Sequence, residues 1–323
     1  MFNTTIKKCI AAGMLLAAGL AQAEFPEKTV RLIVPTPPGN ALDISARLIA
    51  DRLAAKWKQA VIVENKAGGS GIPAMVAAKT APADGYTIVV APSSAAGINP
   101  GLFPQLPYDP LGDFDTIGGI YLGPIMVVAN TKSPYRTLAD VVAAAKKAPG
   151  AVAVAYGGPL GSTQHLSTQL FSHRAEIDVL GVPYKGSAPA MQDLLGGQVE
   201  VLFDSVAAAL PHIAAGTVRP LAVATAQRMT QIQNVPTIAE LGYPDFEAVS
   251  WGGLLVPRGT PPSIIARIEA DVLDIVRDPA VRTQLLSRGL VPDTRGSLAW
   301  RSFMEQEVRK WGNLIKIANI KAE

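Results

Sequence analysis

Glycine-rich loops with hydroxyl side chains are the segments of this chain best suited to chemistry, and that chemistry is anion binding. The segment "TPPGNA" at 36–41 follows the apolar run "VRLIV" and begins a stretch with helical spacing. Its prolines stiffen the turn, Gly39 lets a ligand approach the backbone, and Asn40 can cap the helix, with Asp43 at capping-box spacing. Helix N-termini bind anions without a lysine or arginine. The predicted ligand contacts of this loop are Thr36, Pro38, Gly39, Asn40 and Ala41.

A second segment of the same design, "YGGPLGSTQHL" at 156–166, lies in the other half of the chain. Ser162 or Thr163 can cap the helix that follows it, so hydroxyls and first-turn N–H groups can converge on a carboxylate. The loops "ENKAGGSG" (64–71) and "APSSAAG" (91–97) follow two other apolar runs. Each loop alone could be a capped turn without a ligand, but four of them in two halves indicate a ligand held between two domains. The predicted contacts of these loops are Ser70, Ser93, Tyr156, Gly157, Gly158, Ser162, Thr163 and His165.

Two charged residues at strand ends leave two interpretations open. Asp204 ends the apolar run "VEVLFD", where it could meet an amino group of a ligand or cap the segment that begins at Ser205. Lys185 in "VPYKGS" could pair with a ligand carboxylate or be a solvated turn residue. We include Asp204 among the candidate ligand-binding residues.

Catalytic and cofactor motifs are weak in this sequence. Ser162 and His165 are three residues apart on a predicted helix, but no acid is placed to orient the imidazole, which favours a capping or packing role for His165. The three histidines lack metal-ligand spacing. No G-x-x-x-x-G-K-[ST] motif occurs, and "AGGSG" lacks the full dinucleotide fingerprint. We therefore expect no enzyme activity, no cofactor and no metal.

The N-terminal residues have the composition of a secretory signal. Lys7 and Lys8 precede a short apolar run that ends in "AQA", the pattern of a cleavage site after Ala23. Cys9, the single cysteine, lies inside this segment, so cleavage after Ala23 would leave a mature chain that cannot form a disulfide. Removing two lysines leaves 27 basic against 26 acidic residues, a balance that argues against nucleic acid or an anionic membrane as a partner. We expect a protein of the periplasm.

Strand and helix patterns alternate along the rest of the chain, which predicts an α/β fold of parallel or mixed sheets with helices on both faces. Two longer apolar segments, 117–130 and 247–259, carry glycines that permit a bend and could each pass from one sheet to another. We predict one lobe from 24–123 and 251–323, a second lobe from 124–250, and a two-strand hinge. The last part is expected to be helical. The residues of its final helix expected to face the core are Leu298, Phe303, Trp311 and Leu314.

Several stretches together resemble the substrate-binding receptors of tripartite tricarboxylate transporters, the Bug family. They include "VIVENKAGGSG", "ADGYTIVVAPSS", "YGGPLGSTQHL" and "VPYKGSAPAMQDLLGGQVEVLFDS", and with the other matching stretches they cover nearly everything after Ala23. The resemblance implies a two-lobed Venus-flytrap receptor, similar to type II periplasmic binding proteins, in which one loop of each lobe grips a ligand carboxylate. Those loops correspond here to 36–41 and 157–163. Many relatives have a glycine in place of Asn40 and a phenylalanine in place of Thr36, so the ligand of this chain could differ.

The sequence therefore predicts a monomeric periplasmic receptor that delivers an organic carboxylate to a membrane permease of the tripartite tricarboxylate type. Aliphatic di- and tricarboxylates, acidic amino acids and aromatic carboxylates are all candidate ligands. Neutral, proline-rich loop surfaces favour a flat ring, so an aromatic dicarboxylate such as terephthalate is preferred. A hydrolase or lyase on the same scaffold, which ligand turnover would reveal, and a sensory binding protein are the alternatives.

Overall fold

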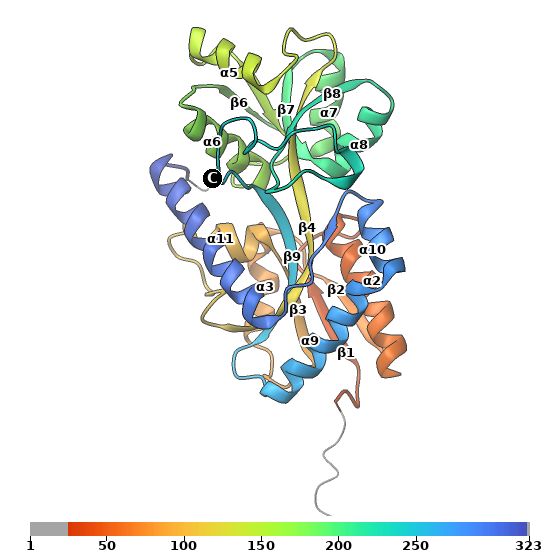
Figure 1. The fold of residues 1–323 in the computed structure, drawn as a ribbon. Coiled ribbons are helices and arrows are strands. Elements are labelled where there is room, and N and C mark those ends of the chain that lie inside the picture. The colour runs from red at the N-terminus through yellow and green to blue at the C-terminus, as the bar shows by residue number, and fades with distance from the viewer. Residues whose placement is uncertain (1–24, 322–323) are drawn as a thin grey trace, which may run out of the picture.

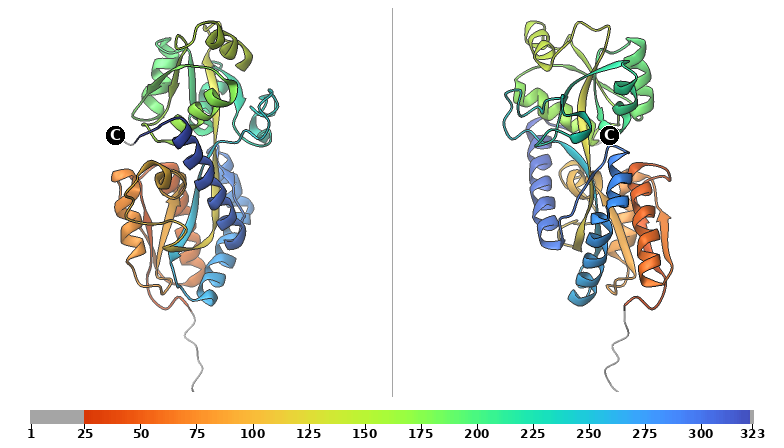
Figure 2. Two further views of the ribbon diagram at one scale, coloured as in Figure 1. Left: turned by 90° about the vertical axis from the view of Figure 1, so that its left-hand side faces the viewer. Right: turned by 45° about the vertical axis from the view of Figure 1, so that its right-hand side comes forward.

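The chain forms two α/β lobes, one above the other in Figure 1. The computed structural model describes residues 25–321, so the predicted signal segment at 1–23 lies outside the described residues. Helices cover both faces of a mixed sheet in each lobe (Figures 1 and 2), which confirms the predicted fold class.

Six strands form the sheet of the lower lobe: β1 Val30–Val34, β2 Val61–Asn65, β3 Thr87–Pro92, β4 Phe114–Asn130, β9 Val249–Pro257 and β10 Val291–Pro292. β1 lies between β2 and β3 and runs parallel to both. β9 follows β3 in the sheet and runs antiparallel to β3 and to β4. The carboxyl ends of β1, β2 and β3 therefore meet at one edge, and this edge carries three of the predicted loops.

Four further strands belong to the upper lobe: β5 Ala153–Tyr156, β6 Leu180–Pro183, β7 Val201–Ser205 and β8 Val218–Val223. β5 runs parallel to β6 and to β7, and β7 and β8 both pair antiparallel with the far end of β4. The register places Tyr156 opposite Phe203, so the loop after β5 begins beside Asp204.

Ten α-helices cover the described sheets. They are α2 Ala41–Trp57, α3 Ile72–Lys79, α4 Asn99–Leu102, α5 Leu138–Lys147, α6 Thr163–Ala175, α7 Ser187–Gly196, α8 Val206–Ala214, α9 Pro262–Arg277, α10 Pro279–Leu286 and α11 Ser297–Ile317. Three shorter helical turns are η1 Gly69–Gly71, η2 Ser94–Ile98 and η3 Thr230–Ile232. Helices α2 and α6 make the crossovers that parallel strands require between β1 and β2 and between β5 and β6.

Two strands connect the lobes. β4 pairs with β9 as far as Pro124 opposite Val249, and from Ile125 onward it pairs with β7 and β8 of the upper lobe. Just before β9, Ala248 N–H donates to the carbonyl of Ala224 at 2.9 Å, so this segment also leaves the upper lobe directly. The predicted two-strand hinge is confirmed, whereas the exact lobe limits at 123/124 and 250/251 stay a prediction.

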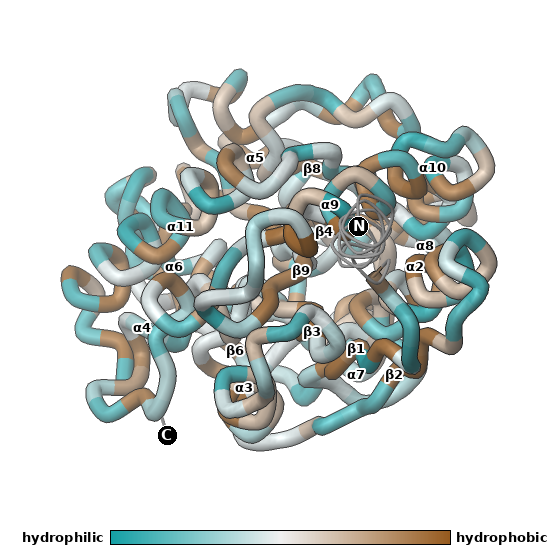
Figure 3. Tube along the Cα trace, turned by 90° about the horizontal axis from the view of Figure 1, so that it is seen from below, coloured by the Kyte–Doolittle hydropathy of each residue, from teal (hydrophilic) through white to brown (hydrophobic). Residues whose placement is uncertain are grey.

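The apolar strands form the interior, as Figure 3 shows for β9 near the centre with hydrophilic segments around the rim. Helix α11 extends this interior across both lobes. Its residues Trp311 and Leu314 belong to the same buried cluster as Leu166 and Phe171 of α6. The C-terminal helix of the lower lobe is therefore packed against the upper lobe (Figure 2).

The expectation that Leu298 faces the core is wrong, because this side chain is 85% exposed. Phe303, Trp311 and Leu314 are buried as predicted. Leu298 lies five residues before Phe303, which turns it about 140° away from the buried face of α11. The position of a residue around the helix, rather than its apolar character, therefore determines whether it is buried.

Candidate ligand-binding site

The loop at 36–41 is fixed by the cap of helix α2. Asn40 Oδ1 accepts from the Asp43 N–H at 3.0 Å and from the Thr36 hydroxyl at 3.1 Å. Because the cap needs an acceptor, Oδ1 faces the helix and the amide Nδ2 remains as a donor. The other N–H groups of the first helical turn have no intrahelical acceptor. Thr36, Asn40 and the helix terminus thus form one polar corner, while Pro37, Pro38, Gly39 and Ala41 are exposed.

The carboxylate of Asp43 stabilises this corner through hydrogen bonds. It accepts from Gly39 N–H at 2.9 Å, one residue before the partner of an ideal capping box, and from Asn65 Nδ2 at 2.8 Å. Arg47 Nε donates to it at 3.0 Å. Burial alone would raise the pKa of Asp43, but the hydrogen bonds from Arg47, Gly39 and Asn65 outweigh burial and lower it. The guanidinium of Arg47 is thus engaged inside its own lobe.

The other two loops of the lower lobe lie next to this corner. Gly71 is so close to Pro35 and Ala95 that an added Cβ would lie 3.1 Å and 3.4 Å from their Cβ atoms. Ser70 is exposed at a positive φ of 54°, and its carbonyl accepts from Asn99 Nδ2 at 3.0 Å. The hydrogen bond at Ser70 is therefore made by its backbone carbonyl and not by its hydroxyl.

The loop after β5 forms the corresponding corner of the upper lobe. Ser162 caps α6 by accepting from the His165 N–H at 3.2 Å. At Gly158, an added Cβ would lie 2.7 Å from Ser162 Oγ, and at Gly157 it would overlap the carboxylate of Asp204. Both glycines are thus required by close approach of their neighbours.

His165 is a buried part of this corner and not a free base. Its Nδ1 accepts from the Gly161 N–H at 3.1 Å, and its ring lies 4.8 Å from that of Tyr156. Burial lowers the pKa of His165 to about 4, so the imidazole is neutral at pH 7. Since Nδ1 accepts, the proton resides on Nε2, which is a donor. The capping and packing role favoured by the sequence agrees with this geometry.

Asp204 lies at the end of β7 and is fully buried. Its Oδ1 accepts from the Ser187 hydroxyl and from the Ser205 N–H, both at 2.7 Å. Burial raises the pKa of Asp204 to about 6, against the opposite effect of these hydrogen bonds. Of the two interpretations left open by the sequence, the hydrogen bond to Ser205 is present in the structure.

The two corners meet across the lobes. Ser93 Oγ, after β3, and Thr163 Oγ1, at the start of α6, share a hydrogen bond of 3.1 Å, and both side chains are buried. Gly161 rests on Leu102 of α4, where an added Cβ would lie 2.6 Å from Cδ2. Among the described residues no hydrogen bond joins 36–41 directly to 157–163. The interlobe hydrogen bond nearest the two loops is therefore the one between Ser93 and Thr163.

Four polar residues of this region were missed by the sequence reasoning. They are Asn65, Asn99, Gln164 and Ser187. Ser187 begins α7 after the glycine of "YKGS", so the strand-to-helix signal used elsewhere could have found it. Asn65 and Asn99 act on backbone atoms of distant loops, which no local pattern indicates. Lys185 is exposed and forms no ion pair among the described residues.

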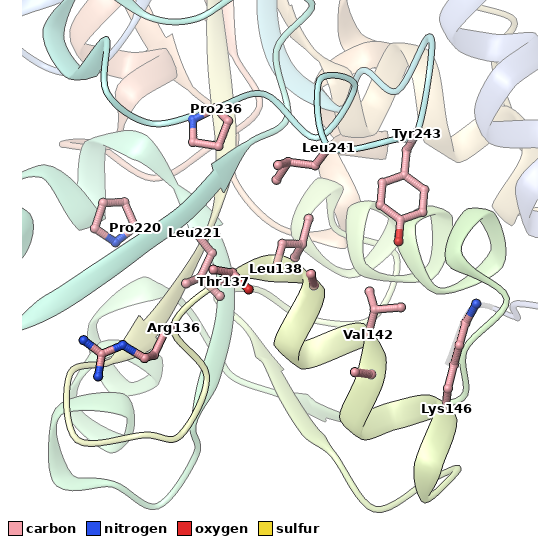
Figure 4. Close-up of a pocket in the computed structure, with 12 residues that line it drawn as sticks. Arg136, Thr137, Leu138, Val142, Lys146, Pro220, Leu221, Pro236, Leu241 and Tyr243 are labelled. Atoms are coloured by element: carbon pink, nitrogen blue, oxygen red, sulfur yellow. The ribbon is translucent and has the colours of Figure 1, made fainter.

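Two pockets lie away from this region. One of about 650 Å³ is enclosed by α5, β8 and the loop at 236–243, where Leu241 and Tyr243 point toward Leu138 and Val142 (Figure 4). Another of about 480 Å³ lies behind the hinge, between Leu122 of β4 and the loop after β8. None of the predicted contacts lines either pocket.

The described part of the chain contains no cluster of acidic, histidine or cysteine side chains that could hold a metal ion. Within residues 25–321 no helix is both long and apolar enough to cross a membrane.

Comparison with known proteins identifies the family of this chain. The model of the tripartite tricarboxylate transporter family receptor matches residues 45–320. Protein BugT of Bordetella pertussis is 35% identical over 302 residues, which cover 93% of this chain and 92% of BugT. A protein of R. palustris solved with adipate is 34% identical, with a TM-score of 0.80 over 92% of this chain and 99% of the other. MatC from Rhodopseudomonas palustris, solved with bound malate, is 31% identical, with a TM-score of 0.75 over 90% of this chain and all 100% of MatC.

These relatives share the two-lobed fold over nearly the whole chain, and the family match covers most of its length. The chain therefore belongs to the receptors of the tripartite tricarboxylate transporter family, which are periplasmic solute-binding proteins.

Proposed function

We propose that this receptor captures an organic carboxylate between its lobes and delivers it unchanged to a membrane permease of the tripartite tricarboxylate type. The observation that carries the proposal is the pairing of two capped helix N-termini, of α2 and α6, on lobes joined by the Ser93–Thr163 hydrogen bond. Each terminus offers N–H groups to an anion. The two loops share no direct hydrogen bond, so a ligand that accepts from both loops would link them.

The charge distribution supports recognition by neutral donors. Arg47 is held by Asp43 and Asn65, and Lys185 is exposed. The remaining donors are N–H groups, hydroxyls, Asn40 Nδ2 and His165 Nε2. A hydrogen bond to a charged group contributes about 1.5–3 kcal/mol. A few such bonds, less the cost of closing the lobes, give a roughly micromolar dissociation constant.

The ligand class follows from the loop surfaces and from the relatives. Pro37 and Pro38 are exposed and neutral, which suits a flat ring, so an aromatic dicarboxylate such as terephthalate is our first candidate. The relatives solved with adipate and malate favour an aliphatic dicarboxylate as the second candidate. Both candidates present a carboxylate that the two loops can grip from opposite lobes.

Delivery requires the permease to distinguish loaded from empty receptor. Closure around a ligand shifts the population of lobe arrangements, and the hinge of β4 and β9 provides the motion. We expect a monomer in the periplasm after removal of residues 1–23.

The test is a thermal-shift screen of the purified protein over di- and tricarboxylates, acidic amino acids and phthalate isomers, followed by calorimetry with the best hit. Asn40→Leu removes a donor and the cap. Gly157→Pro breaks the 3.1 Å hydrogen bond from the Gly157 N–H to the Phe203 carbonyl and crowds Asp204, which displaces the other loop, so each variant should weaken binding at least tenfold. Asn234→Leu, at an exposed position of the upper lobe, is the matched control and should bind normally. Intact affinity in both loop variants would refute the site, and turnover of the ligand would refute the receptor function.

A further inference from the structure

Among the candidate ligand contacts, Asp204 has an ionisable side chain that the proposed binding mode leaves unexplained. It is 0% exposed at the end of β7, and its carboxyl group lies against the Cα of Gly157. Gly157 belongs to the loop that we assign to ligand binding. The absence of a side chain at Gly157 is what lets this carboxyl group approach the loop.

The two oxygens of Asp204 have different surroundings. Oδ1 accepts from the Ser187 hydroxyl and the Ser205 N–H, whereas Oδ2 is buried with no donor in hydrogen-bond geometry. An ionised carboxylate attracts donors to both oxygens, and leaving one buried without a partner costs free energy. A neutral acid has a carbonyl oxygen that accepts and a hydroxyl that donates. The arrangement at Asp204 matches the neutral acid, with Oδ1 as the carbonyl oxygen and Oδ2 as the hydroxyl.

Nothing charged around Asp204 favours ionisation. The pKa of Asp204 is raised by burial and lowered by hydrogen bonds from neutral groups only, which are the side chains of Ser187, Gln164 and Ser205 and the Ser205 N–H. Burial is the largest effect and raises the pKa to about 6. In the sheet, Met126 of β4 lies opposite Asp204, and Tyr156 of β5 lies opposite its neighbour Phe203. Of the helices that pack on β7, α6 carries His165, α7 carries Asp193, which accepts from the Tyr184 hydroxyl, and α8 carries His212. A dianionic ligand entering the loops would disfavour the ionised form further.

We propose that Asp204 in its protonated form donates a hydrogen bond from Oδ2 to a carboxylate of the bound ligand, so that capture takes up one proton. This inference rests on the proposed function, since it names the partner of a ligand carboxylate at that same site. The proton comes from solvent, remains on Oδ2 and is released when the ligand leaves. No covalent bond to the ligand forms or breaks.

The other titratable groups of the site do not change charge between about pH 6 and pH 8. Burial lowers the pKa of His165 to about 4, and the pKa of Asp43 is lowered by its hydrogen bonds despite burial. A change in affinity across this range therefore reports on Asp204. Adipate, malate and terephthalate are themselves mostly ionised at about pH 6 and fully ionised above about pH 7, so the upper half of the range reports on the protein alone.

The experiment measures binding of these three probes by calorimetry from about pH 6 to about pH 8, in two buffers of different ionisation enthalpy. We expect affinity to fall about tenfold per pH unit as Asp204 ionises, with uptake of about one proton per ligand at the upper end. Asp204→Asn replaces the hydroxyl donor by an amide donor and keeps the acceptor at Oδ1. It should bind with the same affinity at every pH and take up no proton.

Asp178→Asn, an exposed aspartate of the same lobe, is the matched control, and His173→Gln and His212→Gln test the histidines outside the site. All three should keep the pH profile of the unmodified protein. Tight binding with a flat profile and no proton uptake would overturn the inference and leave the proposed function standing. A second result would also overturn the inference: a preference for malate over adipate that persists at pH 8 and is lost in Asp204→Asn. That result would mean that Asp204 is ionised and accepts a hydrogen bond from the malate hydroxyl. Failure of all three probes and of every other carboxylate in the thermal-shift panel, at every pH, would overturn both proposals.

Discussion

The hydrogen bond between Ser93 and Thr163 should set part of the balance between closed and open lobes. It joins two buried hydroxyls from opposite lobes over 3.1 Å, so opening must break it. A neutral hydrogen bond of this kind contributes about 0.5–1.5 kcal/mol, which corresponds to a roughly two- to tenfold change in the closed-to-open ratio. Ser93→Ala alone leaves the buried Thr163 hydroxyl without a partner, so it should lower the closed fraction more than the double variant, which removes both hydroxyls.

A double-mutant cycle isolates this contact. Ser93→Ala, Thr163→Val and the double variant would each carry fluorophores at Arg277→Cys and Lys147→Cys, two exposed positions on different lobes. Labelling is selective because the single cysteine of the chain, Cys9, lies in the predicted signal segment. Single-molecule energy transfer then gives the closed fraction without ligand. We expect a coupling energy of about 1 kcal/mol. Additive effects of the two substitutions would refute the assignment of this contact to closure.

Three further predictions concern stability. Asn40→Ala should lower the free energy of unfolding by about 1 kcal/mol through loss of the α2 cap, whereas Asn40→Asp keeps an acceptor and should change it little; denaturant titration measures both. Glu307 accepts from the buried indole N–H groups of Trp251 at 3.0 Å and Trp311 at 2.9 Å, so Glu307→Ala should cost about 2–5 kcal/mol and Glu307→Gln clearly less. Because burial raises the pKa of Asp204 from 3.8 to about 6, ionisation penalises the folded state as pH rises through this interval, and the penalty is complete above it. Asp204→Asn should therefore gain up to about 3 kcal/mol in stability relative to the unmodified protein between pH 3 and pH 8, and an equal difference at both pH values would contradict the raised pKa.

Local patterns in the sequence were sufficient for the features that depend on neighbouring residues. The caps at Asn40 and Ser162 follow from side-chain type and spacing, and the structure has both. The alternation of strands and helices likewise predicted the α/β sheets, and the long apolar segments with glycines predicted the two strands that join the lobes. These features are encoded within a few residues, so a single sequence reveals them.

Features that depend on strand order could not be predicted in this way. Gly157 meets Asp204 because β5 and β7 are neighbours in register, although the 46 residues between Gly157 and Asp204 in the chain include α6, β6 and α7. The grip of Asn65 on Asp43 depends in the same way on β2 lying beside β1. Local sequence patterns identify the residues and their chemistry, but the order and register of the strands decide which of these residues come into contact.

The continuity of β4 through both sheets constrains how receptors of this kind can evolve or be recombined. Side chains of a strand alternate between its faces, so deleting Gly123 would leave the pairing with β9 intact only from Phe114 to Leu122 and would turn every side chain from Ile125 onward to the opposite face. Surface loops can therefore vary in length, while this strand cannot without rebuilding an entire core. Chimaeric receptors that exchange one half for that of a relative should inherit β4 whole, together with the partner strands at both of its ends.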